Sequence, residues 1–207
     1  MITKKRRKQI EKLAVKTRKK LTLDEKENLR LPSYLRLFDI DLGLADLSAK
    51  SVNAYLTYDV KKKKPKIYVD AHQSPEQFLY SLVHEMGHLL LEWQVDITSA
   101  VMNMEEIEKK QRVNKDERLL ATSYKSRDRD GERDDSGSDD ARKEAEADYF
   151  ATCFLMPRRS TRSLLRWACE PKLDLLDAIS TIAWYFDVEQ RRAHLRINEL
   201  MGKEKGQ

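Results

Sequence analysis

The spacing of apolar and polar residues predicts a mostly helical protein with one β-hairpin. Apolar residues recur at helical intervals beneath basic ones in residues 5–21, which predicts an amphipathic helix. β-Branched and aromatic residues alternate with polar ones from Val52 to Val60 and from Lys66 to Ala71. A turn-like stretch separates these two segments, so we expect an antiparallel hairpin. Its second strand could be a sheet edge that pairs with a strand of another chain, or an edge that nearby lysines guard against aggregation.

The next predicted helix runs from Ser74 to about Trp93 and has several start signals. Ser74 suits the N-cap, a proline follows at the first helical position, and Gln77 can close a capping box. The helix is apolar on most of its circumference, so we expect it to be central and buried. Polar residues inside such a helix therefore require an explanation.

The remaining pattern completes an α+β class, mostly helical, with a small antiparallel hairpin or sheet packed on the buried helix. Further helices are predicted at residues 97–110, 142–155, 163–169, 173–186 and 188–201. Between them, residues 111–140 are polar and contain the run SRDRDGERDDSGSDD, which favours a mobile charged insertion. We expect a basic N-terminal helical extension at 1–50, a core at 51–170 and a C-terminal helical pair, packed on the core, at 171–207.

Charge is unevenly distributed along the chain. The formal net charge is +5, but residues 1–20 alone carry +9, which leaves −4 for the rest. A basic arm can attract nucleic acid, an anionic membrane surface or an acidic protein, or it can be a solvated helix face. We expect any nucleic-acid contact to be non-specific and to use the cluster Lys4, Lys5, Arg6, Arg7 and Lys8.

Two cysteines, Cys153 and Cys169, lie among apolar residues of predicted helices, as buried reduced thiols do. The basic start is not followed by the apolar run of a signal peptide, and no stretch is long and apolar enough to span a bilayer. These features predict a cytoplasmic protein without a membrane partner.

The buried helix contains the sequence His84-Glu85-Met86-Gly87-His88. Two histidines four residues apart project from one helix face, so their ring nitrogens can converge on one zinc ion. Glu85 then lies beside the metal and can act as the catalytic base towards water. The alternative is a pair of hydrogen-bonded core histidines beside a buried glutamate, which would cost several kcal/mol unless the carboxylate were neutralised.

A third zinc ligand is expected from the segment EAEADYFA, which begins at Glu144. Glu144 and Asp148 share one helix face, so Glu144 can coordinate the metal while Asp148 accepts the free ring N–H of a histidine. Glu146 is the alternative third ligand, but it lies about 200° around the helix from Glu144, so both cannot face the metal. These acids could also be helix N-terminal charges that the macrodipole favours.

The two motifs together resemble the ImmA/IrrE-type metallopeptidases, which are gluzincin-like enzymes. The resemblance rests on HEMGH in an apolar helix and on EAEADYFATCFLMP, which match the family pattern HExGH followed by E-x-[EQ]-A-[ND]-x-F-A and a terminal L-M-P. It covers about residues 50–202 and assigns Glu144 as ligand and Asp148 to the Asn/Asp position. The gap between His88 and Glu144 is longer than in the family, so residues 97–140 could form a lid, an exosite or a self-blocking loop.

This resemblance implies a zincin-like fold with one zinc ion per chain. It also implies a zinc metallopeptidase, an endopeptidase that hydrolyses a peptide bond in a specific protein. The implied substrate is a helix-turn-helix transcriptional repressor of a mobile element or stress response. For the oxyanion, Tyr149, His72 and His194 are candidates by residue type alone.

Two rival functions remain open from the residues. Residues 182–190, followed by Arg191, Arg192 and Arg196, have the helix, short turn and basic helix of a DNA-binding helix-turn-helix. Alternatively, zinc could stabilise an interaction or anti-repressor protein without catalysis. Glu85 argues against that reading, because a purely structural zinc site needs no base.

Overall fold

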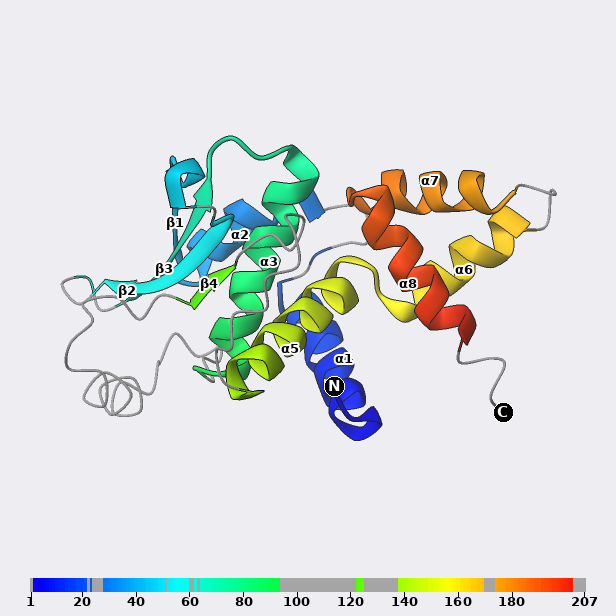
Figure 1. The fold of residues 1–207 in the computed structure, drawn as a ribbon, viewed down its shortest axis with the longest axis horizontal. Helices are drawn as coiled ribbons and strands as arrows, with labels where there is room; N and C mark the ends of the chain where they lie inside the picture. Colours follow the sequence, from blue (N-terminus) through cyan, green and yellow to red (C-terminus); the bar gives the residue numbers. More distant parts are fainter. Residues whose placement is uncertain are drawn as a thin grey trace.

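A small mixed β-sheet lies at one end of the molecule and the C-terminal helices lie at the other (Figure 1). The computed structural model describes residues 2–21, 23, 28–50, 52–59, 62, 64–93, 122–124, 138–169 and 174–202. The elements in chain order are α1 (Lys4–Lys20), η1 (Asn28–Arg30), α2 (Leu31–Leu37), β1 (Asp41–Ala45), η2 (Ser48–Lys50), β2 (Ala54–Asp59), β3 (Lys64–Asp70), α3 (Pro75–Leu91), β4 (Thr122–Tyr124), α5 (Ser138–Leu155), α6 (Arg158–Cys169), α7 (Leu175–Phe186) and α8 (Gln190–Gly202). This is the α+β arrangement that the sequence predicts.

The sheet has the order β1-β3-β2-β4. β2 and β3 form the predicted antiparallel hairpin, with Leu56 opposite Ile67. β1 was not predicted and pairs parallel with β3, so β3 is a central strand and the hypothesis of an edge strand at Lys66–Ala71 is wrong. β4 pairs with the other side of β2 although it comes from the segment predicted to be a mobile insertion. The predicted helix at 97–110 lies outside the described residues.

Helix α3 is the buried helix that the sequence predicts. Ser74 is its N-cap and accepts a hydrogen bond from the Gln77 backbone N–H at 3.2 Å. The Gln77 side chain does not complete a capping box, because its amide donates to Glu189 at the start of α8, at 2.9 Å. Every residue from Leu79 to Leu90 is buried, since α3 packs between the sheet and α5.

A glycine permits the close crossing of α3 and α5. A Cβ atom added to Gly87 would lie 3.1 Å from the Ala147 Cα and 3.3 Å from the Phe150 ring. Backbone atoms cannot retreat as a flexible side chain can, so a larger residue would separate the helices. The small residues Gly87 and Ala147 therefore bring the first half of α5 against the histidine-bearing face of α3.

The described parts of the first fifty residues belong to this packed structure. Ile10 and Ala14 of α1 are fully buried, and α1 packs along α5. β1 lies in the same stretch of chain and belongs to the sheet. The predicted boundary at residue 50 therefore does not separate an extension from the core.

Charged side chains fasten the C-terminal helices to α1. Arg196 of α8 is 0% exposed and donates to Glu199 at 2.7 Å, to Glu11 at 3.4 Å and to the Met156 carbonyl at 3.2 Å. Arg158 of α6 donates to Glu11 at 2.7 Å.

Among the described residues, no helix is long and apolar enough to cross a membrane. Cys153 is buried with a free thiol, as predicted, whereas the Cys169 side chain lies outside the described residues.

Candidate metal centre

His84 and His88 meet on the face of α3 that packs against α5. Both side chains are fully buried, and their Nε2 atoms are 3.0 Å apart. A spacing of four residues places the rings one above the other on a helix, as the sequence motif predicts. The two nitrogens therefore point at a common position between α3 and α5.

Glu144 of α5 reaches the same position with both carboxylate oxygens. Oε2 lies 3.2 Å from the His84 Nε2, and Oε1 lies 3.3 Å from the His88 Nε2. His84, His88 and Glu144 thus form a possible metal-binding group, with one ligand atom from each within 4.8 Å of the others. Tetrahedral ligands at zinc bond lengths of about 2.1 Å are separated by about 3.4 Å, so the three side chains fit an ion of that size.

The outer nitrogens of both rings face carboxylates. The His84 Nδ1 lies 3.1 Å from Asp148 Oδ1, and the His88 Nδ1 contacts Glu92 Oε1. A carboxylate is an acceptor, so each Nδ1 carries the proton. In the neutral rings both Nε2 lone pairs then point towards each other and towards the Glu144 oxygens. Such a convergence of acceptors is repulsive unless a proton or a metal ion lies among them.

The pKa directions of these groups reflect attraction between the histidines and the carboxylates. Burial lowers the pKa of His88, but Glu144 and Glu92 more than offset it and raise the value to about 10. Burial raises the pKa of Glu144, yet the two histidines bring it down to about 2. The cluster therefore attracts positive charge strongly.

Glu85 lies beside this group without a side-chain partner. Its side chain is 0% exposed and neither carboxylate oxygen has a hydrogen bond of normal geometry, although the Leu56 backbone N–H of β2 is near enough to lower its pKa, as the smallest of its effects. Burial raises its pKa to about 7, while His84 and His88 pull it in the opposite direction. A carboxyl group with this pKa can take up and release a proton near neutral pH.

Glu146, the alternative third ligand, points away from the histidines. Arg6 of α1 donates to Glu146 Oε2 through Nε at 2.9 Å and through Nη2 at 2.5 Å. Glu144 and Glu146 thus occupy different sides of α5, as their 200° separation predicts. The structure brings His84, His88, Glu144 and Asp148 together and assigns Glu146 to the contact with α1.

Two residues of the centre were missed in the sequence. Glu92 lies four residues after His88, and Tyr80 lies four residues before His84, so both share the histidine face of α3. The Tyr80 hydroxyl bonds to the backbone carbonyl and the carboxylate of Asp148, at 3.2 Å each. The four-residue spacing that identified the histidines would have identified these residues too.

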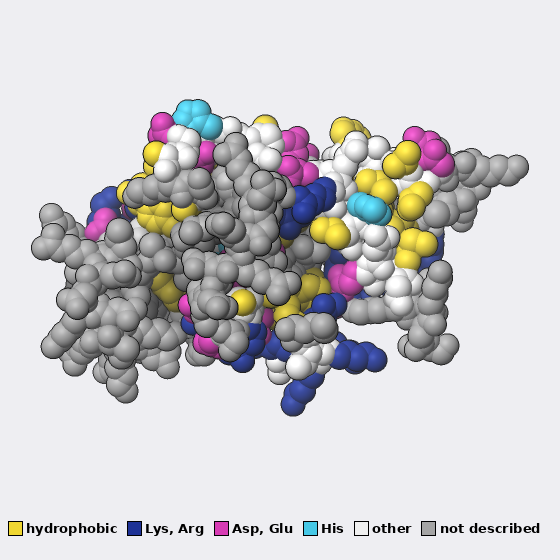
Figure 2. Space-filling model, viewed as in Figure 1, with side chains coloured by type: hydrophobic (Ala, Val, Ile, Leu, Met, Phe, Trp, Pro, Cys, Tyr) yellow, Lys and Arg dark blue, Asp and Glu magenta, His cyan; other side chains and the backbone are white. Residues whose placement is uncertain are grey.

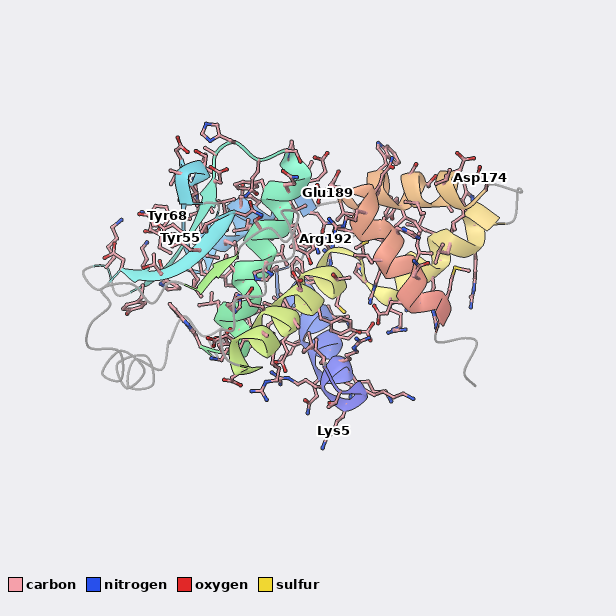
Figure 3. The ribbon with its side chains drawn as sticks, in the orientation of Figure 1. Lys5, Tyr55, Tyr68, Asp174, Glu189 and Arg192 are labelled. Atoms are coloured by element: carbon pink, nitrogen blue, oxygen red, sulfur yellow. The ribbon has the colours of Figure 1, made fainter. Side chains whose placement is uncertain are left out.

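Tyr80 also links the centre to α8. The Arg192 guanidinium lies 3.8 Å from the centroid of the Tyr80 ring, a cation–π contact. Figure 3 labels Arg192 and Glu189 where α8 begins, beside α3. The pKa of Asp148 is lowered overall. Burial raises it, but His84, together with smaller contributions from Arg192 and Tyr80, lowers it by more. The C-terminal helices thus contact the centre through Tyr80.

The three residues considered for the oxyanion lie elsewhere. The Tyr149 hydroxyl donates to Glu199 at 3.0 Å, on the side of α5 that faces α8. The His72 side chain is 64% exposed and lies beside Asp70 after β3, and His194 is exposed on α8. Among the described contacts, none of the three connects to the histidine pair.

Two basic residues of the helix-turn-helix alternative are engaged in packing, one of them in the interior. Arg196 is fully buried in its cluster with Glu11 and Glu199. Arg192 covers the Tyr80 ring. A recognition helix presents such side chains to DNA, so the geometry of α8 favours a packing role.

Comparison with known proteins informs the fold alone. No protein-family model matches the sequence, and no curated protein matches it. A solved structure of a Mycobacterium tuberculosis transcriptional regulator is similar, with a TM-score of 0.54 and 14% identity over 92% of this chain and 46% of that chain. The chain thus spans less than half the length of that regulator. The resemblance to ImmA/IrrE-type metallopeptidases stays a prediction carried by the two motifs.

Proposed function

We propose that this protein is a zinc-dependent endopeptidase in which His84, His88 and Glu144 hold one zinc ion and Glu85 is the catalytic base. The observation that carries the proposal is the convergence of two Nε2 atoms and a carboxylate, 3.0 to 3.3 Å apart, beside a buried glutamate that has no side-chain partner. If the site had no function, the burial of the Glu85 carboxylate without compensation would destabilise the fold by several kcal/mol.

The residues of the centre have distinct roles in this proposal. When bound, zinc supplies a Lewis acid that polarises the scissile carbonyl and lowers the pKa of water. Glu85 takes the proton of the attacking water and delivers it to the leaving nitrogen, for which its pKa near 7 is suited. Asp148 and Glu92 keep the proton of each histidine on Nδ1, so that both Nε2 atoms stay available as ligands.

The substrate proposed is a protein, specifically a helix-turn-helix repressor. This narrower proposal rests on the family resemblance of the motifs and not on the geometry. An enzyme of this kind acts on one partner, so cleavage of a general substrate such as casein is not expected. A repressor encoded beside this gene is the substrate to test.

Elemental analysis of the purified protein tests the metal site. We expect about one zinc per chain in the wild type, the stoichiometry of a single catalytic site. Glu144→Ala should weaken zinc binding and Glu146→Ala should not, because Glu146 binds Arg6 instead. A wild-type protein that neither contains nor binds a divalent metal would remove the peptidase proposal.

Glu85→Gln separates catalysis from metal binding. The variant should keep its zinc and its fold, while cleavage of the repressor falls by about 10²- to 10⁴-fold, the usual effect of losing a general base. Cleavage at the wild-type rate would show that Glu85 is not the base.

A further inference from the structure

The basic side chains of α1 divide into two sets that point in different directions. The sequence does not distinguish the two sets, because all of these side chains carry the same charge. The three arginines turn inwards: Arg6 binds Glu146, Arg7 lies 5.3 Å from the Tyr149 ring centroid, and Arg18 bonds to the Phe154 carbonyl at 3.0 Å. These arginines therefore fasten α1 to α5.

The lysines turn outwards. Six are exposed, namely Lys4, Lys5, Lys8, Lys12, Lys16 and Lys19. None of the six forms an ion pair with a residue that the structure describes. Glu11, the one acid of α1, is drawn inwards to Arg158 and Arg196. Figure 3 shows Lys5 projecting from the free end of α1, and Figure 2 shows Lys and Arg side chains gathered there. The result is a lysine face without carboxylates of its own helix.

The length of this lysine face suits a phosphate backbone. At about 1.5 Å per residue, Lys4 and Lys19 lie about 22 Å apart along the helix. One strand of duplex DNA presents a phosphate about every 3.4 Å along its axis, or about six phosphates over the same length. Six flexible ammonium groups can therefore meet a similar number of phosphates.

A membrane surface fits the lysine face less well. An interfacial helix inserts its apolar side between lipids, but Ile10 and Ala14 of α1 are already buried under α5. Lysine ammonium groups act as mobile point charges, whereas base recognition uses side chains fixed in a groove. The arrangement favours a linear polyanion bound through its backbone.

We propose that the lysine face of α1 binds the phosphate backbone of nucleic acid without reading its sequence. This binding surface adds to the proposed function because it lies close to the candidate metal centre. Arg6 holds α1 to Glu146, two residues along α5 from Glu144, so bound nucleic acid would lie one helix away from the metal centre. The lysine face does not depend on the metal, so either proposal can fail without the other.

The test is binding of a fluorescent duplex of about 25 base pairs and arbitrary sequence, followed by anisotropy across a range of salt concentrations. Each neutralised phosphate contributes about 0.9 to the slope of log K against log salt, so we expect a slope of about −4 to −5. Changing Lys4, Lys8 and Lys12 together to Gln should reduce the magnitude of this slope by about 3. A second duplex sequence should bind equally well.

The matched control removes three exposed arginines elsewhere, Arg36, Arg159 and Arg166, each changed to Gln. Net charge falls by the same amount in both variants, but the control should keep the slope within about 1 of the wild type. Equal losses in the two variants would overturn the proposal, because overall charge would then explain binding. Circular dichroism melting confirms that both variants are folded.

Vesicles that contain phosphatidylserine form the second arm of the experiment. We expect weaker binding to vesicles than to the duplex at the same salt concentration. Lysine-dependent binding to vesicles with no binding to the duplex would overturn the nucleic-acid proposal and assign the lysine face to a membrane surface.

Discussion

Two charge clusters, each largely enclosed, differ in whether their charges balance. The cluster around Arg196 has two cations and two anions, with Arg158 and Arg196 facing Glu11 and Glu199. The metal centre has four carboxylates and no permanent cation among its own residues; its members are His84, Glu85, His88, Glu92, Glu144 and Asp148. Arg192 acts on Asp148 from outside, through the Tyr80 side of the cluster.

The difference separates a cluster that is balanced within the chain from the possible metal-binding group, which is not. Enclosed charges are costly unless each has a partner, and the Arg196 cluster meets that condition within the chain. In the metal centre the histidines must gain protons or the site must gain a metal ion. An imbalance of charge in a well-packed interior is thus stronger evidence for a site than the presence of charged residues.

The largest expected effect is the loss of the balanced cluster. Arg196→Ala removes its fully buried cation and leaves Glu11 and Glu199 partly unpaired, so the free energy of unfolding should fall by about 3–5 kcal/mol. Urea denaturation measures this change in the free energy of unfolding, with the Arg166→Ala variant of an exposed residue as the control. The zinc content per folded chain should not change. If zinc were lost while stability remained, the clusters would not be independent.

Glu85→Gln tests the imbalance in the metal-free protein. The folded pKa of about 7 lies above the ordinary value of 4.5, so the folded state binds this proton more tightly than the unfolded state. Wild-type stability relative to the variant should therefore fall as pH rises from about 4.5 to 7. At pH 8, with metal removed from both proteins by a chelator, the variant should be more stable than the wild type by about 3 kcal/mol. At pH 4 the two proteins should be equally stable. Thermal melting at both pH values checks the sign, and a difference independent of pH would refute it.

Tyr80→Phe should affect the metal more than the fold. The change keeps the ring under Arg192 but removes the hydroxyl that holds Asp148, so His84 is oriented less firmly. We expect zinc affinity to fall about tenfold, by competition with a chromophoric chelator. In the Asp148→Asn background the same change should have a smaller effect. Equal losses in both backgrounds would show that Tyr80 does not act through Asp148.

The smallest expected effect is that of Glu146→Gln. Its ion pair with Arg6 is partly exposed, with 38% of the Arg6 side chain accessible, so we expect a loss of about 1 kcal/mol or less in chemical denaturation. Zinc affinity should equal that of the wild type. A weaker zinc site would mean that the α1 contact positions Glu144, and the comparison between the two sides of α5 would need revision.

Local patterns were sufficient to predict most helices, the hairpin and the proximity of His84, His88 and Glu144. The motif on α3 and the shared face of Glu144 and Asp148 depend on residues three or four positions apart, a distance that helical geometry determines. The parallel strand β1 was missed because it has five residues and a central Gly43, and its partner residues in β3 lie 25 positions further on. Strand pairing of this kind depends on distant contacts.

Side-chain destinations were the least predictable feature. Nothing in the sequence distinguishes Lys5 from Arg6 and Arg7. In the structure Arg6 forms an ion pair with Glu146 and Arg7 lies over the ring of Tyr149, both on α5. Gln77 has the position of a capping-box residue, but Glu189 offers its amide an acceptor from another helix. In each case a residue more than a hundred positions away decides the outcome.

The attachment of α1 also constrains how the protein is made. Its Arg6 bonds to a residue 140 positions later, and Glu11 bonds to Arg158 and Arg196, which are 147 and 185 positions later. During synthesis α1 therefore emerges long before any of these partners, and its apolar face stays uncovered until α5 follows. Since α5 also carries Glu144, the ribosome must complete most of this chain before the helix can dock and before Glu144 can meet the two histidines. Docking of α1 and assembly of the proposed metal-binding group should thus arise in the same late step of folding.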